Sequence, residues 1–202
     1  MLRVGLTGNV ASGKSAVLEL FKHWGAATTD ADLLAREAVA PLSPGLAAIV
    51  QRFGNEVLLP GGGLDRVALR RRVMADDAER AALNAIVHPA VAVLMAARED
   101  QLRRQGRKII VHDIPLLFEA LNPDDFDVVV LVDAPPALRR QRLMNDRGLS
   151  AADADALIAA QQPAEAKRAR SHFVIDNAEG RAALESQARA VWTKLQEQAG
   201  IA

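Results

Sequence analysis

Glycine, lysine and serine near the start of the chain have the spacing that phosphate binding requires. The stretch LTGNVASGKS contains G-x-x-x-x-G-K-S from Gly8 to Ser15, between an apolar run and an amphipathic segment. Glycines let the backbone turn tightly, so N–H groups and the positive end of the next helix face anionic oxygens. Lys14 can bridge the outer phosphates of a nucleotide, and the Ser15 hydroxyl can hold Mg²⁺. An ordinary turn before a helix is the alternative. The context favours a nucleotide site that comprises Gly8, Ala11, Ser12, Gly13, Lys14, Ser15 and Ala16.

Two carboxylates follow the second short apolar run. Asp30 and Asp32 stand in TTDAD, and they would share a face if the chain were extended there. The carboxyl ends of parallel strands surround the ligand crevice in open α/β sheets. An aspartate at that edge can accept the proton of an attacking hydroxyl. The alternative is that either aspartate caps the helix expected over LLAREAV.

Two further aspartates end later apolar runs. Asp113 and Asp133 could each reach the ligand shell of a bound Mg²⁺. We favour Asp113, because we expect its strand to lie beside the first strand. For Asp133, which directly precedes APP, we prefer the role of a turn residue. The predicted metal ligands are therefore Ser15 and Asp113.

Basic side chains gather late in the chain, in the stretches LRRQRLMNDRG and AKRAR. These side chains are Arg139, Arg140, Arg142, Arg147, Lys167, Arg168 and Arg170. One interpretation is a solvated helix face. The other is a lid that brings guanidinium groups to the phosphates, where charge develops during transfer. Arg139 and Arg142 are three positions apart and would share a helix face.

Strands and helices alternate along the chain, which predicts a parallel, doubly wound sheet. The expected strands are 2–7, 26–29, 108–113, 127–133 and 172–176. Asp65 and Ser150 are predicted caps of helices that begin at residues 66 and 151. The last helix, 181–198, is expected to pack Trp192 into the core.

The alternation is interrupted twice. Residues 33–105 are mostly helical and suit substrate recognition, and residues 136–170 are helical and suit a lid. We therefore predict one domain over 1–202, with a nucleotide core at 1–32, 106–135 and 171–202 and with this insertion and this lid. His88, directly before Pro89, is interpreted from its surroundings as a capping or core histidine between two helices.

Composition excludes several classes of protein. The 202 residues hold 25 basic and 25 acidic side chains, no cysteine and only 3% aromatics. A general nucleic-acid binder would usually be basic, and disulfides and thiolate metal sites need cysteine. The N-terminus does not resemble a signal peptide, and no apolar run approaches the length of a membrane span. We expect a soluble cytoplasmic protein, a monomer or small homo-oligomer, with no nucleic-acid or membrane partner.

Several motifs agree, in order, with one known family. They are LTGNVASGKS, DADLLAR, LNAIVHPAV, DIPLLFE, RLM, IAAQ and VIDN. With them the chain resembles the dephospho-coenzyme A kinase family over nearly its whole length. The phosphate loop alone is shared by many families, whereas its combination with DAD, HP and PLLFE in this order is far more specific.

The resemblance implies an α/β P-loop kinase fold with a five-stranded parallel sheet, a helical acceptor-binding insertion and a helical lid. It implies ATP and Mg²⁺ as cofactors and transfer of the γ-phosphate to the 3′-hydroxyl of dephospho-CoA. The implied base is Asp32, which joins Lys14 and Arg142 as a catalytic residue, and Asn177 is implied to lie near the adenine. The substrate-binding residues that it implies are Asp32, Arg36, His88, Leu116 and Phe118.

The chain departs from the family pattern at two places. Ala16 stands where threonine is usual, and Asp146 stands where arginine is common, with Arg147 one position later. Two alternatives stay open at this point. One is another small-molecule kinase, such as a shikimate or nucleoside kinase, and the other is a non-catalytic ATP-binding module or switch.

Overall fold

The computed structural model describes residues 1–74 and 76–201. They form two compact units. The first comprises Met1–Thr29 and the chain from Leu102 onward, and the second is Asp30–Gln101. The first unit contains the residues of the predicted lid and those of the predicted core except 30–32. The second coincides with the predicted insertion to within a few residues at each end.

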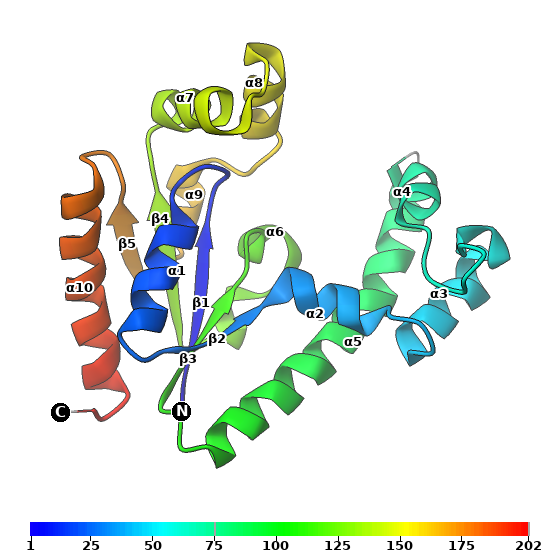
Figure 1. Cartoon of the computed structure of the whole chain (residues 1–202), viewed down its shortest axis with the longest axis horizontal. Coiled ribbons are helices and arrows are strands. Elements are labelled where there is room, and N and C mark those ends of the chain that lie inside the picture. Colours follow the sequence, from blue (N-terminus) through cyan, green and yellow to red (C-terminus); the bar gives the residue numbers. More distant parts are fainter. Residues whose placement is uncertain (75, 202) are drawn as a thin grey trace. The chain divides into compact units, whose positions relative to one another are not determined.

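A five-stranded sheet in the order β2-β3-β1-β4-β5 forms the centre of the first unit (Figure 1). Its strands are β1 Leu2–Gly8, β2 Ala27–Asp30, β3 Ile109–Asp113, β4 Val128–Asp133 and β5 Phe173–Asp176. β1 pairs in parallel with both β3 and β4, and β4 pairs in parallel with β5. The predicted α/β class and five-stranded parallel sheet are confirmed.

The helices of the first unit follow the strands in the expected alternation. They are α1 Lys14–His23, α6 Leu117–Ala120, α7 Pro136–Arg147, α8 Ala151–Ala159, α9 Ala164–Arg168 and α10 Arg181–Gln198, with a 3₁₀ turn at Pro123–Asp125. Ser150 accepts a hydrogen bond from the Asp153 N–H at 3.1 Å, which confirms it as the cap of α8. The Asp153 carboxylate accepts from the Ser150 hydroxyl rather than from its N–H, so the capping box is only half formed.

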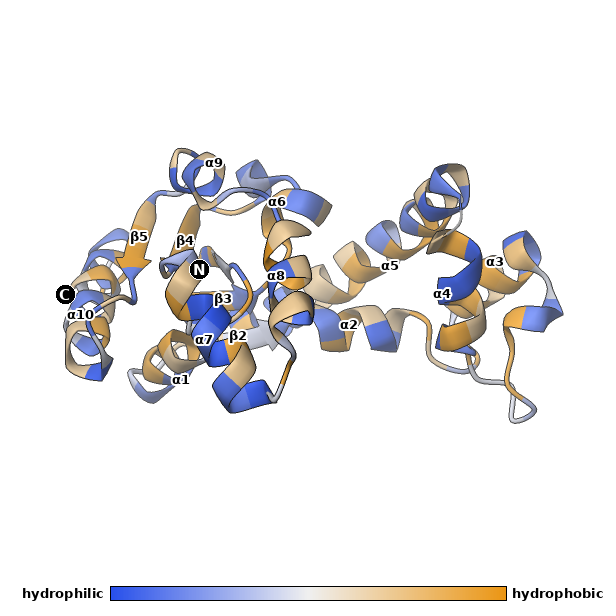
Figure 2. Cartoon of the chain, turned by 90° about the horizontal axis from the view of Figure 1, so that it is seen from above, coloured by the Kyte–Doolittle hydropathy of each residue, from blue (hydrophilic) through white to orange (hydrophobic). Residues whose placement is uncertain are grey.

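One face of the sheet is packed against α1 and α10. Alternate residues of β1, such as Val4 and Leu6, are fully buried against this layer. Phe21 of α1 and Trp192 of α10 have ring centroids 5.6 Å apart. Trp192 is 3% exposed, so its predicted place in the core is confirmed. β4 and β5 are drawn in the colour of apolar residues, whereas much of α7 is hydrophilic (Figure 2).

The second unit is helical. It contains α2 Ala31–Ala38, α3 Pro44–Phe53, α4 Arg66–Met74, most of α5 Asp77–Arg104 and a 3₁₀ turn at Asn55–Val57. Asp65 accepts hydrogen bonds from the N–H groups of Val67 and Ala68, which confirms the predicted cap of α4.

α5 differs from the expectation at His88. The helix continues through Pro89, so His88 lies inside one helix and not between two. An 18-residue window of α5 has a mean hydropathy of 1.5, so by length and composition alone it could cross a membrane. The same helix also contains Asn84, His88 and Pro89.

Candidate functional site: a phosphate loop braced by side chains

The loop between β1 and α1 has the backbone shape that its glycines allow. Gly13, which directly precedes α1, has φ 95°, and a side chain there would collide with the amide of Asn177. A side chain at Gly8 would collide with the Val132 carbonyl. Ala11 has φ 58°, which is costly for a residue with a Cβ. Strained backbone of this kind persists only where surrounding contacts hold it.

The first residue of α1 is paired with the end of β3. Lys14 Nζ forms an ion pair with Asp113 Oδ1, and both side chains are largely buried. The pair forms because Asp113 lies opposite Leu6 in the register of β3 and β1. The structure confirms the predicted adjacency of β3 and β1, on which the preference for Asp113 depends. Ser15, the next residue of the motif, is exposed.

Mg²⁺ bound with a nucleotide takes most of its ligands from phosphate oxygens and water. The part of the chain that the structure describes has no group of three or more His, Cys, Asp or Glu that could form a protein-only metal site. Ser15 and Asp113 supply a hydroxyl and one carboxylate beside the loop, a donor set that suits an ion held mainly by phosphate oxygens and water. Ser12 Oγ is buried and has no hydrogen-bond partner among the described residues.

Arg142 of α7 contacts the loop directly. Its Nη1 donates to the Ala11 carbonyl at 3.1 Å and to the Ser12 carbonyl at 3.4 Å, and its Nη2 donates to the Asn177 carbonyl at 3.2 Å. Asn177 is buried and donates from Nδ2 to the Ser12 carbonyl at 2.8 Å. The structure therefore brings together two predicted site residues, Arg142 and Asn177, on the second half of the loop.

The other three arginines of α7 are placed differently, and one of them, Arg140, pairs with Asp155 at 2.7 Å. Arg139 is buried and donates from Nε to the Ala134 carbonyl at 3.1 Å. Burial lowers the pKa of the Arg139 guanidinium from its ordinary value, and Asp133 and Glu165 oppose that shift. Arg147 is exposed and directly precedes Gly148, which has φ 66° and ends the helix.

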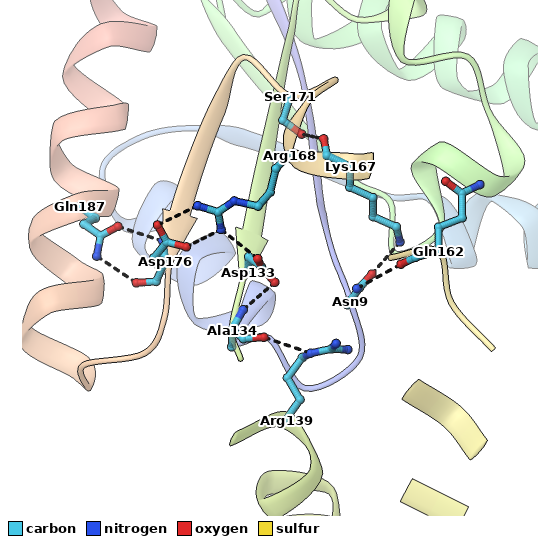
Figure 3. A network of polar contacts seen from close by, with 10 residues as sticks. All are labelled: Asn9, Asp133, Ala134, Arg139, Gln162, Lys167, Arg168, Ser171, Asp176 and Gln187. Carbon is cyan, nitrogen blue, oxygen red and sulfur yellow. Dashed lines mark hydrogen bonds and ion pairs between the residues drawn. The ribbon is translucent and has the colours of Figure 1, made fainter. Parts of the chain in front are cut away.

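Two basic residues of AKRAR are held by neighbouring side chains. Lys167 is fully buried, and Arg168 is bound to the carboxylates of Asp133 and Asp176 (Figure 3). Hydrogen bonds to Asp176 and Asp133 raise the pKa of the Arg168 guanidinium above its ordinary value. Asp133 accepts from the Ala134 N–H at 2.8 Å, which agrees with the predicted turn role. Its ion pair with Arg168 was not predicted from the sequence.

Sequence reasoning missed the contacts on the first half of the loop. The Val10 N–H donates to Gln161 Oε1 at 2.7 Å, and Lys167 Nζ donates to Asn9 Oδ1 at 2.6 Å. These partners are more than 150 positions apart in the chain. The only signal in the sequence was the IAAQ motif, which contains Gln161 but suggests no partner.

Asp30 and Asp32 have distinct places. Asp30 Oδ1 accepts from the N–H groups of Asp32 and Leu33 at 2.8 and 3.1 Å, so Asp30 is the cap of α2. Asp32 lies in the first turn of α2 and is exposed. The two do not share an extended face, because the chain becomes helical at Ala31.

The remaining predicted acceptor residues lie on both units. Arg36 is exposed in the last turn of α2, and His88 is half-buried in α5. In the first unit Leu116 is 47% exposed, whereas Phe118 is 7% exposed and lies under the Arg170 guanidinium. Leu116 is thus accessible to a ligand, and Phe118 mainly packs.

A parallel sheet with β1 between β3 and β4, a glycine-rich phosphate loop and an arginine helix after β4 define a P-loop kinase. The sequence profile described as dephospho-CoA kinase matches residues 2–182. The chain belongs to the dephospho-CoA kinase family, and the resemblance found in its motifs is confirmed.

Individual relatives agree with this assignment. The chain is 47% identical to a dephospho-CoA kinase of Anaeromyxobacter dehalogenans, over 92% of this chain and 88% of the relative. The crystal structure of TT1252 from Thermus thermophilus is 35% identical with a TM-score of 0.81, over 96% and 97% of the two chains. Dephospho-CoA kinase from Campylobacter jejuni, 23% identical over 96% and 97%, shares the fold with a TM-score of 0.72.

Proposed function

We propose that this chain transfers the γ-phosphate of ATP to the 3′-hydroxyl of dephospho-CoA, and so produces coenzyme A and ADP. The observation that carries the proposal is the braced phosphate loop with Lys14 and Asp113 beside it, in a chain of the dephospho-CoA kinase family. The alternatives raised by the sequence, another small-molecule kinase or a non-catalytic module, have no comparable support.

ATP occupies the loop from Gly8 to Ala16 in this proposal. Backbone N–H groups and the start of α1 face the phosphates. The Lys14 ammonium, which pairs with Asp113 in this structure, also contacts the β- and γ-phosphates when ATP is bound. When bound with ATP, Mg²⁺ would neutralise phosphate charge, and Ser15 and Asp113 are the residues that would hold it. Asn177 keeps the Ser12 carbonyl in place and lies near the adenine.

Asp32 is the proposed base. Asp30 satisfies the N–H groups at the start of α2, so the Asp32 carboxylate is not needed for capping. It is free to accept the proton of the 3′-hydroxyl as that oxygen attacks. The acceptor is positioned by Arg36, His88 and Leu116. Phe118, which is buried, contributes to this site mainly by packing.

Arg142 stabilises the charge that spreads over the transferred group. Its guanidinium lies on the carbonyls of Ala11 and Ser12, in the loop that is proposed to hold the phosphates. A planar fork with several donors suits phosphate oxygens better than a point charge does. The enzyme is proposed to act in the cytoplasm as a monomer or small homo-oligomer, without a nucleic-acid or membrane partner.

The test is ADP release from ATP with a panel of acceptors. Dephospho-CoA should support turnover, whereas adenosine, shikimate and nucleoside monophosphates should not. A comparable rate with shikimate would replace the proposal with its nearest alternative. ATP binding without turnover on any acceptor would indicate a non-catalytic module.

A further inference from the structure

The buried ammonium of Lys167 is not used in the reaction proposed above. Lys167 lies in the short helix α9 and is 0% exposed. Lysine is almost never fully buried unless it is paired, because desolvation of its charge costs several kcal/mol. Its burial here calls for partners that compensate that cost.

Lys167 has two such partners. Its Nζ donates to Asn9 Oδ1 at 2.6 Å and pairs with Glu119 Oε1 at 2.7 Å. Asn9 is itself buried, at 4% exposed, and is the second residue of the phosphate-loop motif. Figure 3 shows the Lys167 side chain reaching down from α9 to the Asn9 amide.

The contact fixes the orientation of the Asn9 side chain. An ammonium can only donate, so it must face the amide oxygen and not the amide nitrogen. The opposite end of the amide, Nδ2, donates to the Gln162 carbonyl at 3.4 Å. The Asn9 backbone carbonyl accepts from the Ser12 N–H at 3.0 Å, which closes the turn of the loop. A fixed Asn9 therefore constrains the first half of the loop.

Glu119 anchors the lysine from the segment that follows β3. Its side chain is 21% exposed, and its Oε1 also accepts from the Gln162 N–H at 3.4 Å. β3 itself ends at Asp113, the partner of Lys14 at the far end of the loop. The chain of β3 and α6 is thus linked to both ends of the phosphate loop, through Lys14 and through Lys167.

We propose that Lys167 is a positioning residue that, held by Glu119, fixes Asn9 and so keeps the first half of the phosphate loop in the shape that receives ATP. Lys167 does not touch the nucleotide; it acts through Asn9. The inference rests on the proposed function insofar as the loop binds ATP. A hydrogen bond to a charged group typically contributes enough for its loss to weaken ATP binding about tenfold or more.

The experiment is a double-mutant cycle in the parent protein, in which E119Q and K167M are always made together. The pair is exchanged as a unit because either change alone would leave a buried charge without its partner, and glutamine at 119 can still accept from the Gln162 N–H. The variants N9A, E119Q/K167M and N9A/E119Q/K167M are compared with the parent protein by calorimetric titration with ATP, with Tm recorded for each. K22M serves as a matched control, because Lys22 pairs with Glu19 on the exposed side of α1.

We expect E119Q/K167M to weaken ATP binding about tenfold, to leave kcat at saturating ATP nearly unchanged and to keep the Tm close to that of the parent. N9A/E119Q/K167M should bind no more weakly than N9A alone, because both changes act on one contact. K22M should match the parent.

Parental ATP affinity in E119Q/K167M, or additive losses in the cycle, would show that Lys167 only packs and would overturn the inference. Failure of the parent enzyme to bind ATP would instead overturn the proposed function.

Discussion

Lys14 and Asp113 neutralise each other at a largely buried position, so each depends on the other. We expect Lys14→Ala to lower kcat/KM by at least about a hundredfold, because a preorganised charge on the phosphates is lost and no other lysine lies in the loop. Steady-state kinetics of folded protein measure the effect. Lys22→Ala on the exposed face of α1 is the control. Near-parental turnover of Lys14→Ala would contradict the kinase assignment.

Asp30 and Asp32 are proposed to have different roles: Asp30 caps α2, and Asp32 is the base. Asp32→Asn should bind ATP normally and lose turnover by about 10²–10⁴-fold, because an amide cannot accept the proton. Its Tm should be unchanged, since the cap of α2 is Asp30. Asp30→Asn is the matched control, because asparagine caps about as well as aspartate. Normal turnover of Asp32→Asn together with an inactive Asp30→Asn would mean that the base is Asp30.

At the scale of elements, α7 places its four arginines in different environments. Arg139 is buried, Arg140 pairs with Asp155, Arg142 lies on the loop and Arg147 is exposed. Arg142→Ala should lower kcat more than Arg147→Ala does, and more than it weakens ATP binding, because the charge that it stabilises develops in transfer. Arg142→Lys should rescue poorly, since lysine lacks the planar fork. Kinetics of the three variants decide the matter. A larger kcat loss in Arg147→Ala would show that Arg147 replaces the arginine missing at Asp146.

The elements themselves were largely predictable from the sequence, and the reasons are local. β3 and β4 are nearly continuous aliphatic runs, and Asp65 and Ser150 cap helices through N–H groups two or three residues away. Continuation of α5 through Pro89 was not predictable, because neighbouring packing decides whether a helix tolerates the missing N–H. The burial of Lys167 was not predictable from the sequence either, because its contact with Asn9 joins residues 158 positions apart.

At the scale of the whole molecule, the polar residues proposed to bind ATP and those proposed to bind the acceptor belong to different units. The phosphate loop, α7 and Asn177 belong to the first unit, whereas Asp32, Arg36 and His88 belong to the second. Arg36→Ala and His88→Ala should therefore raise the KM for dephospho-CoA and leave the KM for ATP nearly unchanged. Initial rates with each substrate varied in turn test this division. An equal rise in both KM values would contradict it.

The central claim is that the γ-phosphate of ATP is placed on the 3′ oxygen of dephospho-CoA. Phosphorus NMR of the product formed by the parent enzyme tests it most directly, with Asp32→Asn as the matched inactive protein. The account predicts one new phosphomonoester resonance, coupled to the ribose 3′ position, together with stoichiometric ADP. A phosphate on the 2′ oxygen or on the pantetheine end, or ADP formed without any phosphorylated acceptor, would contradict it.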